Sequence, residues 1–95
     1  MDIAARFGRN IARCRKRAGQ SQEELSIRAS LHRTEVSQLE RGLRLARIDT
    51  LVKVAGALGV TPNDLLIGIE WSAGSATLGS FEVAAEGERQ AAPRA

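Results

Sequence analysis

Four of the nine glycines divide the first 68 residues into short segments whose apolar residues repeat with helical spacing. In residues 2–18, apolar side chains recur every three or four positions, which places them on one face of a helix. Glycine commonly follows the last residue of a helix, because it adopts positive φ without strain. The chain is therefore expected to form several short helices, most of which end at a glycine: Gly19, Gly42, Gly59 and Gly68.

Two positions carry clear signals for the start of a helix. Ser21 is followed three residues later by Glu24, which is the spacing of a capping box, and Thr61 precedes Pro62 in a similar role. Leucine, isoleucine, valine and alanine supply most of the apolar residues, which favours packed helices over a β-sandwich. We expect an all-α domain of five helices, at residues 2–18, 22–29, 33–41, 48–58 and 62–67.

The apolar pattern also predicts which side chains face inward. In residues 33–41, Val36 and Leu39 are expected to face the core, with Leu43 continuing in that direction. Four arginines of residues 2–18 lie off the apolar stripe and are expected on other faces: Arg6, Arg9, Arg13 and Arg17. In residues 48–58 the predicted inner face consists of Ile48, Leu51, Val52, Ala55 and Leu58.

The last 27 residues differ in character from the rest of the chain. Residues 69–71 and 78–83 each match a short strand, so residues 69–83 are expected to form an extended, hairpin-like segment. Residues 84–95 are expected to be a disordered tail. The predicted organisation is a helical domain at 1–68, an extension at 69–83 that packs or dimerises, and a tail at 84–95.

Charge is distributed unevenly along the chain. Residues 1–47 hold 11 Arg or Lys against 5 Asp or Glu, whereas residues 48–95 hold 3 against 6. A basic half is typical of a protein that binds a polyanion, but an ordinary solvated helix surface carries similar charges. Charge alone leaves both interpretations open.

Several function classes are disfavoured by what the sequence contains. Cys14 is the only cysteine and lies on an apolar helix face, so we expect a buried, reduced thiol and a cytoplasmic location. His32, the only histidine, is expected at the surface rather than on a phosphate. We find no metal-ligand cluster, cofactor motif, catalytic constellation, signal peptide or membrane-spanning run, and expect a protein that is not an enzyme.

Residues 22–41 have the arrangement of two short helices joined by a tight turn. The major groove of B-form DNA accommodates one α-helix, and the second helix exposes polar side chains opposite Val36. Arginine bonds guanine bidentately, glutamine bonds adenine, and the threonine methyl contacts that of thymine. The candidate base-contacting residues are Arg33, Thr34, Ser37 and Gln38, with Arg41 beside them.

Three runs along the chain resemble the Cro-type, phage-repressor-like helix-turn-helix family, whose members are called xenobiotic-response-element regulators. The runs are residues 22–26, 29–33 and 36–42, and the similarity extends over residues 7–67. The resemblance implies a compact five-helix, repressor-like domain that binds operator DNA as a dimer. It implies base contacts at the four residues named above and backbone contacts at Gln22, Arg41, Arg44 and Arg47.

The resemblance also implies an ion pair between Arg15 and Glu40. Helical periodicity supports this pair independently, because each residue falls about 40° from a core position on its own helix, where a charge needs a partner. Three positions depart from the family pattern: Ser26 replaces Ala, Ser30 replaces Gly, and Gln20 replaces an apolar residue. Ser30 must then adopt positive φ without the freedom of glycine.

The end of the helical domain and the extension together contain too many apolar residues for a free tail. We expect them to pack against the helices or across a homodimer; packing within one chain would leave a monomer. The expected function is a DNA-binding transcriptional repressor. The alternative is an antitoxin-like autorepressor whose C-terminal segment binds a protein partner, and a small-ligand sensor ranks last. The apolar residues that are expected to pack in this way are Leu65, Leu66, Ile67, Ile69, Trp71, Leu78, Phe81 and Val83.

Overall fold

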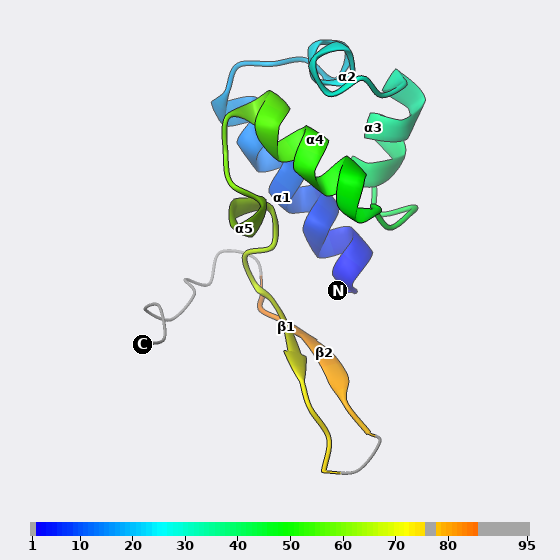
Figure 1. The fold of residues 1–95 in the computed structure, drawn as a ribbon, viewed down its shortest axis with the longest axis vertical. Helices are drawn as coiled ribbons and strands as arrows, with labels where there is room; N and C mark the ends of the chain where they lie inside the picture. The colour runs from blue at the N-terminus through cyan, green and yellow to red at the C-terminus, as the bar shows by residue number, and fades with distance from the viewer. Residues whose placement is uncertain (1, 76–77, 86–95) are drawn as a thin grey trace.

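The computed structural model describes residues 2–75 and 78–85, which form a bundle of five helices followed by a two-stranded hairpin (Figure 1). This confirms the expected all-α domain with a hairpin-like extension. The predicted helices agree with the observed ones to within two residues at each end. The elements are α1 (Ile3–Arg17), α2 (Gln22–Ala29), α3 (Arg33–Glu40), α4 (Ile48–Leu58), α5 (Pro62–Leu65), β1 (Ile69–Ser72) and β2 (Ser80–Val83).

The helix boundaries follow the capping signals in the sequence. At the start of α2, the Ser21 hydroxyl accepts from the Glu24 backbone N–H at 3.0 Å, and the Glu24 carboxylate accepts from the Ser21 N–H at 3.1 Å. These bonds lower the pKa of Glu24, the backbone bond first. Thr61 and Asp64 form a second capping box at α5. Each cap satisfies amide groups that lack partners in the first helical turn.

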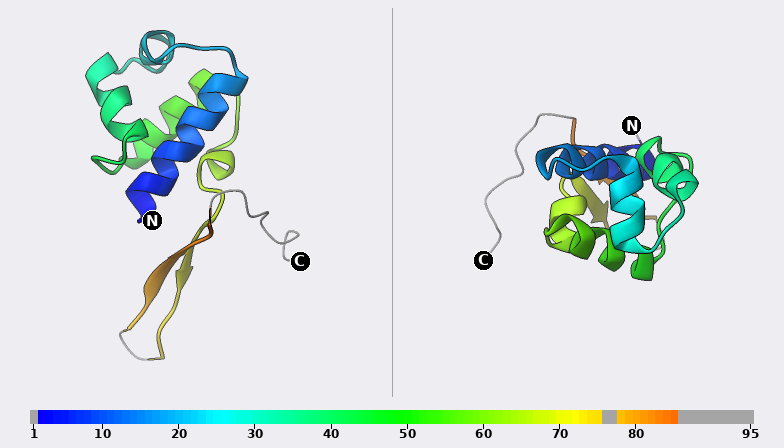
Figure 2. Two further views of the ribbon diagram at one scale, coloured as in Figure 1. Left: turned by 180° about the vertical axis from the view of Figure 1, so that it is seen from behind. Right: turned by 90° about the horizontal axis from the view of Figure 1, so that it is seen from above.

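The core lies between α1 and α4, with α2 and α3 closing one side (Figures 1 and 2). Three predicted core positions are wrong: Ile48, Val52 and Leu43 are 79%, 57% and 61% exposed. On α4, Val54 and Thr50 are buried instead, together with Ala55 and Leu58. The buried face of α4 therefore does not include Ile48 and Val52. The helix carries more apolar residues than the neighbouring elements can cover.

The hairpin has one apolar and one polar face. Trp71 pairs with Phe81 across the strands, and Glu70 pairs with Glu82. Because side chains alternate along a strand, Trp71 and Phe81 share a face with Ile69 and Val83, while the glutamates lie on the other. The two aromatic rings meet edge to face with centroids 5.0 Å apart. The hairpin projects from the bundle, and this apolar face is the one that needs covering (Figure 1).

A buried arginine attaches the hairpin to the bundle. Arg6 is 1% exposed, so the prediction that it lies away from the packed surface is wrong. Its guanidinium donates to the Ala84 carbonyl and to the Asn10 side chain, and Asn10 donates to the carbonyls of Leu65 and Ile67 at 2.9 Å each. The polar side of α1 is thus the anchor for the end of α5 and the base of the hairpin. Residues 86–95, most of the expected tail, lie outside the described residues.

The contact between α1 and α3 depends on Gly8. A Cβ atom placed on Gly8 lies only 2.3 Å from the Leu39 carbonyl oxygen and 2.6 Å from that of Glu40. Both oxygens belong to the backbone at the end of α3, so they cannot move aside as a side chain does. Glycine therefore sets the distance between α1 and the C-terminal end of α3.

Gly8→Ala is expected to lower the free energy of unfolding by about 1–3 kcal/mol, because α3 must shift to admit the methyl group. Gly56→Ala is the matched control, since Gly56 lies inside α4 with nothing near its Cβ position. That substitution is expected to stabilise the protein by up to about 1 kcal/mol through helix propensity. Urea denaturation measures both, and an equal effect of the two variants contradicts the close contact.

Candidate nucleic-acid interface

The turn between α2 and α3 is tight and left-handed. Ser30 adopts φ 55° and ψ 47°, as the sequence required of the residue at this position. The Leu31 N–H donates to the Ser26 carbonyl at 2.8 Å, which closes the end of α2. Ser26 itself is buried and its hydroxyl donates to the Glu23 carbonyl at 2.6 Å. Ser26 and Ser30 therefore both fit where the family favours a smaller residue. The left-handed conformation of Ser30 costs about 1–2 kcal/mol.

One side of α3 packs and the opposite side is open. Val36 and Leu39 are each 1% exposed. Arg33 and Thr34 are exposed, and Ser37 and Gln38 are half-buried. At about 100° per residue these four polar side chains occupy one continuous face, with Arg41 directly after the helix on the same side. The four sequence-predicted base-contacting residues thus lie together on the open face of α3.

Glu40 joins three helices beside this face. Its carboxylate accepts two bonds from the Arg15 guanidinium, at 2.6 and 3.0 Å, and both side chains are largely buried. The hydrogen bond to Glu40 raises the pKa of Arg15 further above its ordinary value. Gln22, at the first position of α2, also donates to Glu40, at 3.1 Å. The carboxylate therefore holds the end of α3 against α1 and the start of α2.

The bond from Gln22 to Glu40 was not predicted from the sequence. Gln22 was expected only as a contact to DNA phosphate, and nothing in residues 22–26 distinguishes that role from a bond to Glu40. Gln20, which replaces an apolar residue of the family pattern, donates from its amide nitrogen to the Ala57 carbonyl at 3.1 Å. Its side-chain oxygen is buried with no hydrogen-bond partner among the described residues, which is an energetic cost at this position.

The loop between α3 and α4 borders the other edge of the open face. Arg44 donates to the Gln38 side-chain oxygen at 3.3 Å and lies 4.0 Å from the Glu35 carboxylate. Arg47 lies 3.6 Å from Asp49, and both side chains are largely exposed. Around α3 the order is Glu40, then the four base-contacting candidates ending with Gln38, then Glu35. Predicted backbone contacts therefore flank the open face on both sides: Gln22 beside Glu40, and Arg44 beside Gln38.

The side chains of the histidine and the cysteine of the chain are not part of the described hydrogen-bond network around α3. His32 is exposed and its side chain does not cap α3. Cys14 is buried, and burial raises the pKa of its thiol. Within residues 2–75 and 78–85, no three or more His, Cys, Asp or Glu side chains gather as a metal site requires. None of the helices described is long and apolar enough to cross a membrane.

Glu40→Ala is expected to lower the free energy of unfolding by about 1–3 kcal/mol, because Arg15 and Gln22 lose a shared buried partner. DNA affinity is expected to fall with it, since α3 is no longer fixed to α1. Glu35→Ala is the matched control on the same helix and is expected to cost less than about 1 kcal/mol. Thermal denaturation measures both, and an unchanged melting temperature in Glu40→Ala rules out this role for the pair.

Comparisons with known proteins agree with this geometry. Residues 11–65 match the family described as helix-turn-helix. The chain is 41% identical over 66 residues to the control protein C.BamHI of Bacillus amyloliquefaciens, an alignment that covers 68% of this chain and 82% of that protein.

Solved structures give the same result. The restriction-modification controller protein C.AhdI of Aeromonas hydrophila superimposes with a TM-score of 0.64 at 34% identity, over 65% of this chain and 94% of that one. The biofilm regulator SinR, solved in complex with DNA, superimposes with a TM-score of 0.61 at 34% identity, over 63% of this chain and 97% of that one. This chain therefore belongs to the helix-turn-helix family of DNA-binding transcriptional regulators.

Proposed function

We propose that this protein binds a two-part operator as a homodimer and represses transcription from the promoter that the operator overlaps. The observation that carries the proposal is the open polar face of α3, bordered on both sides by groups suited to phosphate. In the proposed complex α3 enters the major groove with its N-terminal end foremost. Arg33, Thr34, Ser37 and Gln38 then reach base edges, while Gln22, Arg41, Arg44 and Arg47 reach the backbone.

The contact between Arg44 and Gln38 supports a role for Gln38 in base recognition. The guanidinium donates to the amide oxygen of Gln38 at 3.3 Å, which favours one orientation of that amide. The oxygen retains a second lone pair and the amide nitrogen retains its donors. An amide held in this way suits the bidentate bond to adenine, which needs one donor and one acceptor.

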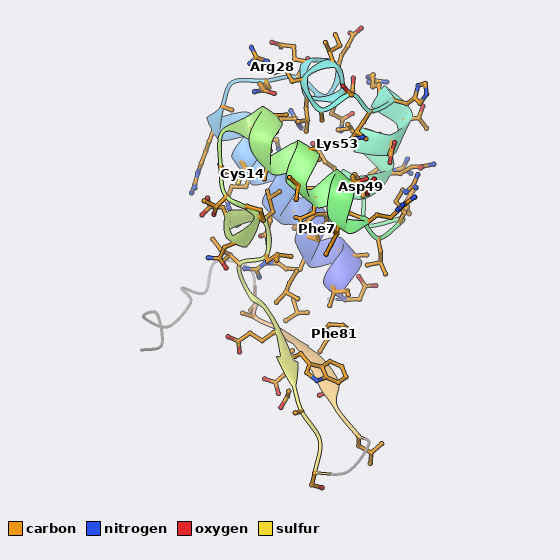
Figure 3. The ribbon with its side chains drawn as sticks, viewed as in Figure 1. Phe7, Cys14, Arg28, Asp49, Lys53 and Phe81 are labelled. Atoms are coloured by element: carbon orange, nitrogen blue, oxygen red, sulfur yellow. The ribbon has the colours of Figure 1, made fainter. Side chains whose placement is uncertain are left out.

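The uncovered apolar surface supports dimerisation. A groove of about 200 Å³ lies at the base of the hairpin, and its lining includes Phe7, Leu51, Leu66 and Phe81. Figure 3 labels Phe7 on α1 and Phe81 on β2. Despite this groove, Trp71 and Phe81 are still 58% and 57% exposed. A two-stranded hairpin is marginally stable by itself, so its apolar face needs a partner surface. A second copy supplies that surface and, through twofold symmetry, a second α3 for the other half-site.

Selection of bound duplexes from a random-sequence pool is expected to enrich an inverted repeat. Gln38→Ala is then expected to relax the preference at one base pair of each half-site by about 1–3 kcal/mol. Arg47→Gln is expected to weaken all sequences alike and to reduce the salt dependence by about one phosphate contact. If both variants change sequence preference in the same way, the division into base and backbone contacts is wrong. A promoter-reporter assay with the selected site tests repression.

Light scattering of the full chain is expected to give the mass of a dimer. Phe81→Ser is expected to shift the protein towards monomer, because it removes an aromatic ring from the apolar face of the hairpin. Glu82→Ser, the neighbouring residue on the opposite face of β2, is expected to leave the dimer intact. A monomeric wild-type protein contradicts the proposed dimer and directs attention to a different protein partner for the same surface, as the antitoxin-like alternative requires.

A further inference from the structure

A basic groove runs along the outer side of α1 to the end of α3. Its volume is about 690 Å³, and the charged residues that line it are Arg9, Arg13, Lys16, Arg17, Glu40 and Arg41. We propose that this α1 groove binds the phosphate backbone of the duplex whose bases α3 contacts. The inference rests on the proposed function and assigns a second DNA-contacting surface to it.

The shape of the groove comes from small residues on α1. Ala5 and Ala12 line it and are seven residues apart, so they lie within about 20° of each other around the helix. Arg9 and Lys16 form a second row with the same spacing, on the side of α1 opposite the fully buried Ile11. The two cations are about 10 Å apart along the helix axis, which is far enough to contact different phosphates of one strand.

The charge of the groove suits a polyanion. Its lining includes five basic side chains and one carboxylate, and that carboxylate, Glu40, is already bonded to Arg15. A phosphodiester strand that binds basic side chains releases its condensed counterions, which favours binding.

The position of the groove matches the geometry of a major-groove complex. Glu40 and Arg41 belong both to the groove and to the border of the open face of α3. Arg44 lies at the opposite border, beside Gln38. A helix in the major groove has one phosphate strand on each side, so the loop carrying Arg44 meets one strand and the α1 groove meets the other.

The test compares two charge-matched double variants. Arg9→Gln with Lys16→Gln removes two cations from the α1 groove. Arg28→Gln with Lys53→Gln removes two cations from the surface of α2 and α4, which faces the viewer in Figure 3, whereas α1 lies in front when the molecule is seen from behind (Figure 2). Binding of each protein is measured between 50 and 200 mM salt, on the selected operator duplex and on a duplex of unrelated sequence.

The groove variant is expected to lose about two units of the slope of log K against log salt, since each phosphate contact contributes about 0.9. The ratio of the DNA-binding constant of the wild-type protein to that of the groove variant should then fall about tenfold between 50 and 200 mM salt. Its base preference should be unchanged, and the control variant should keep the wild-type slope. Lys16→Gln alone should lose about one unit, which keeps the test valid if the double variant is unstable.

Equal slopes for the groove and control variants overturn the proposal. That outcome differs from failure of the proposed function, which is an absence of any enriched sequence. Counterion release does not require a specific sequence, so the unrelated duplex reports on the groove even in that case.

Discussion

The bidentate ion pair between Arg15 and Glu40 fixes the recognition helix to its scaffold. Glu40 lies at the end of α3 whose backbone packs against Gly8 of α1, and Gln22 of α2 shares the same carboxylate. A recognition helix must keep its position and direction relative to the base pairs that it contacts. An isolated helix of eight residues is too short to be stable in water. The orientation of α3 therefore depends on contacts to α1 and α2 more than on helix propensity.

α1 links the two ends of the molecule. One side of it holds α3 through Gly8 and Arg15, and another holds the hairpin through Arg6 and Asn10. In the proposed dimer the hairpin sets where the second copy lies, so the same helix relates the dimer interface to both recognition helices. A rigid α1 then determines the spacing of the two half-sites. The outward face of α1, which carries Arg9 and Lys16, is the part proposed to contact the DNA phosphate backbone.

The helices and their caps were predictable because each depends on residues close in sequence. Capping boxes and post-helical glycines are local signals, and they located all five helices in the described chain. The errors arose where distant residues decide. Ile48 and Val52 match an inner face by spacing but have no neighbour to cover them, and Arg6 is buried because the ends of α5 and β2 return to α1. The pairing of Glu40 with Arg15 follows from the family resemblance and is supported by helical periodicity, whereas the bond of Glu40 to Gln22 depends on how α2 packs.

The most direct test of the account is methylation interference on the selected operator. Methylation of guanine N7 modifies the major groove, whereas methylation of adenine N3 modifies the minor groove. The account predicts that methylated guanine N7 blocks binding within two half-sites about one helical turn apart, or a multiple of that, and that methylated adenine N3 does not interfere within them. Interference confined to adenine N3 would place the protein in the minor groove and contradict insertion of α3 into the major groove.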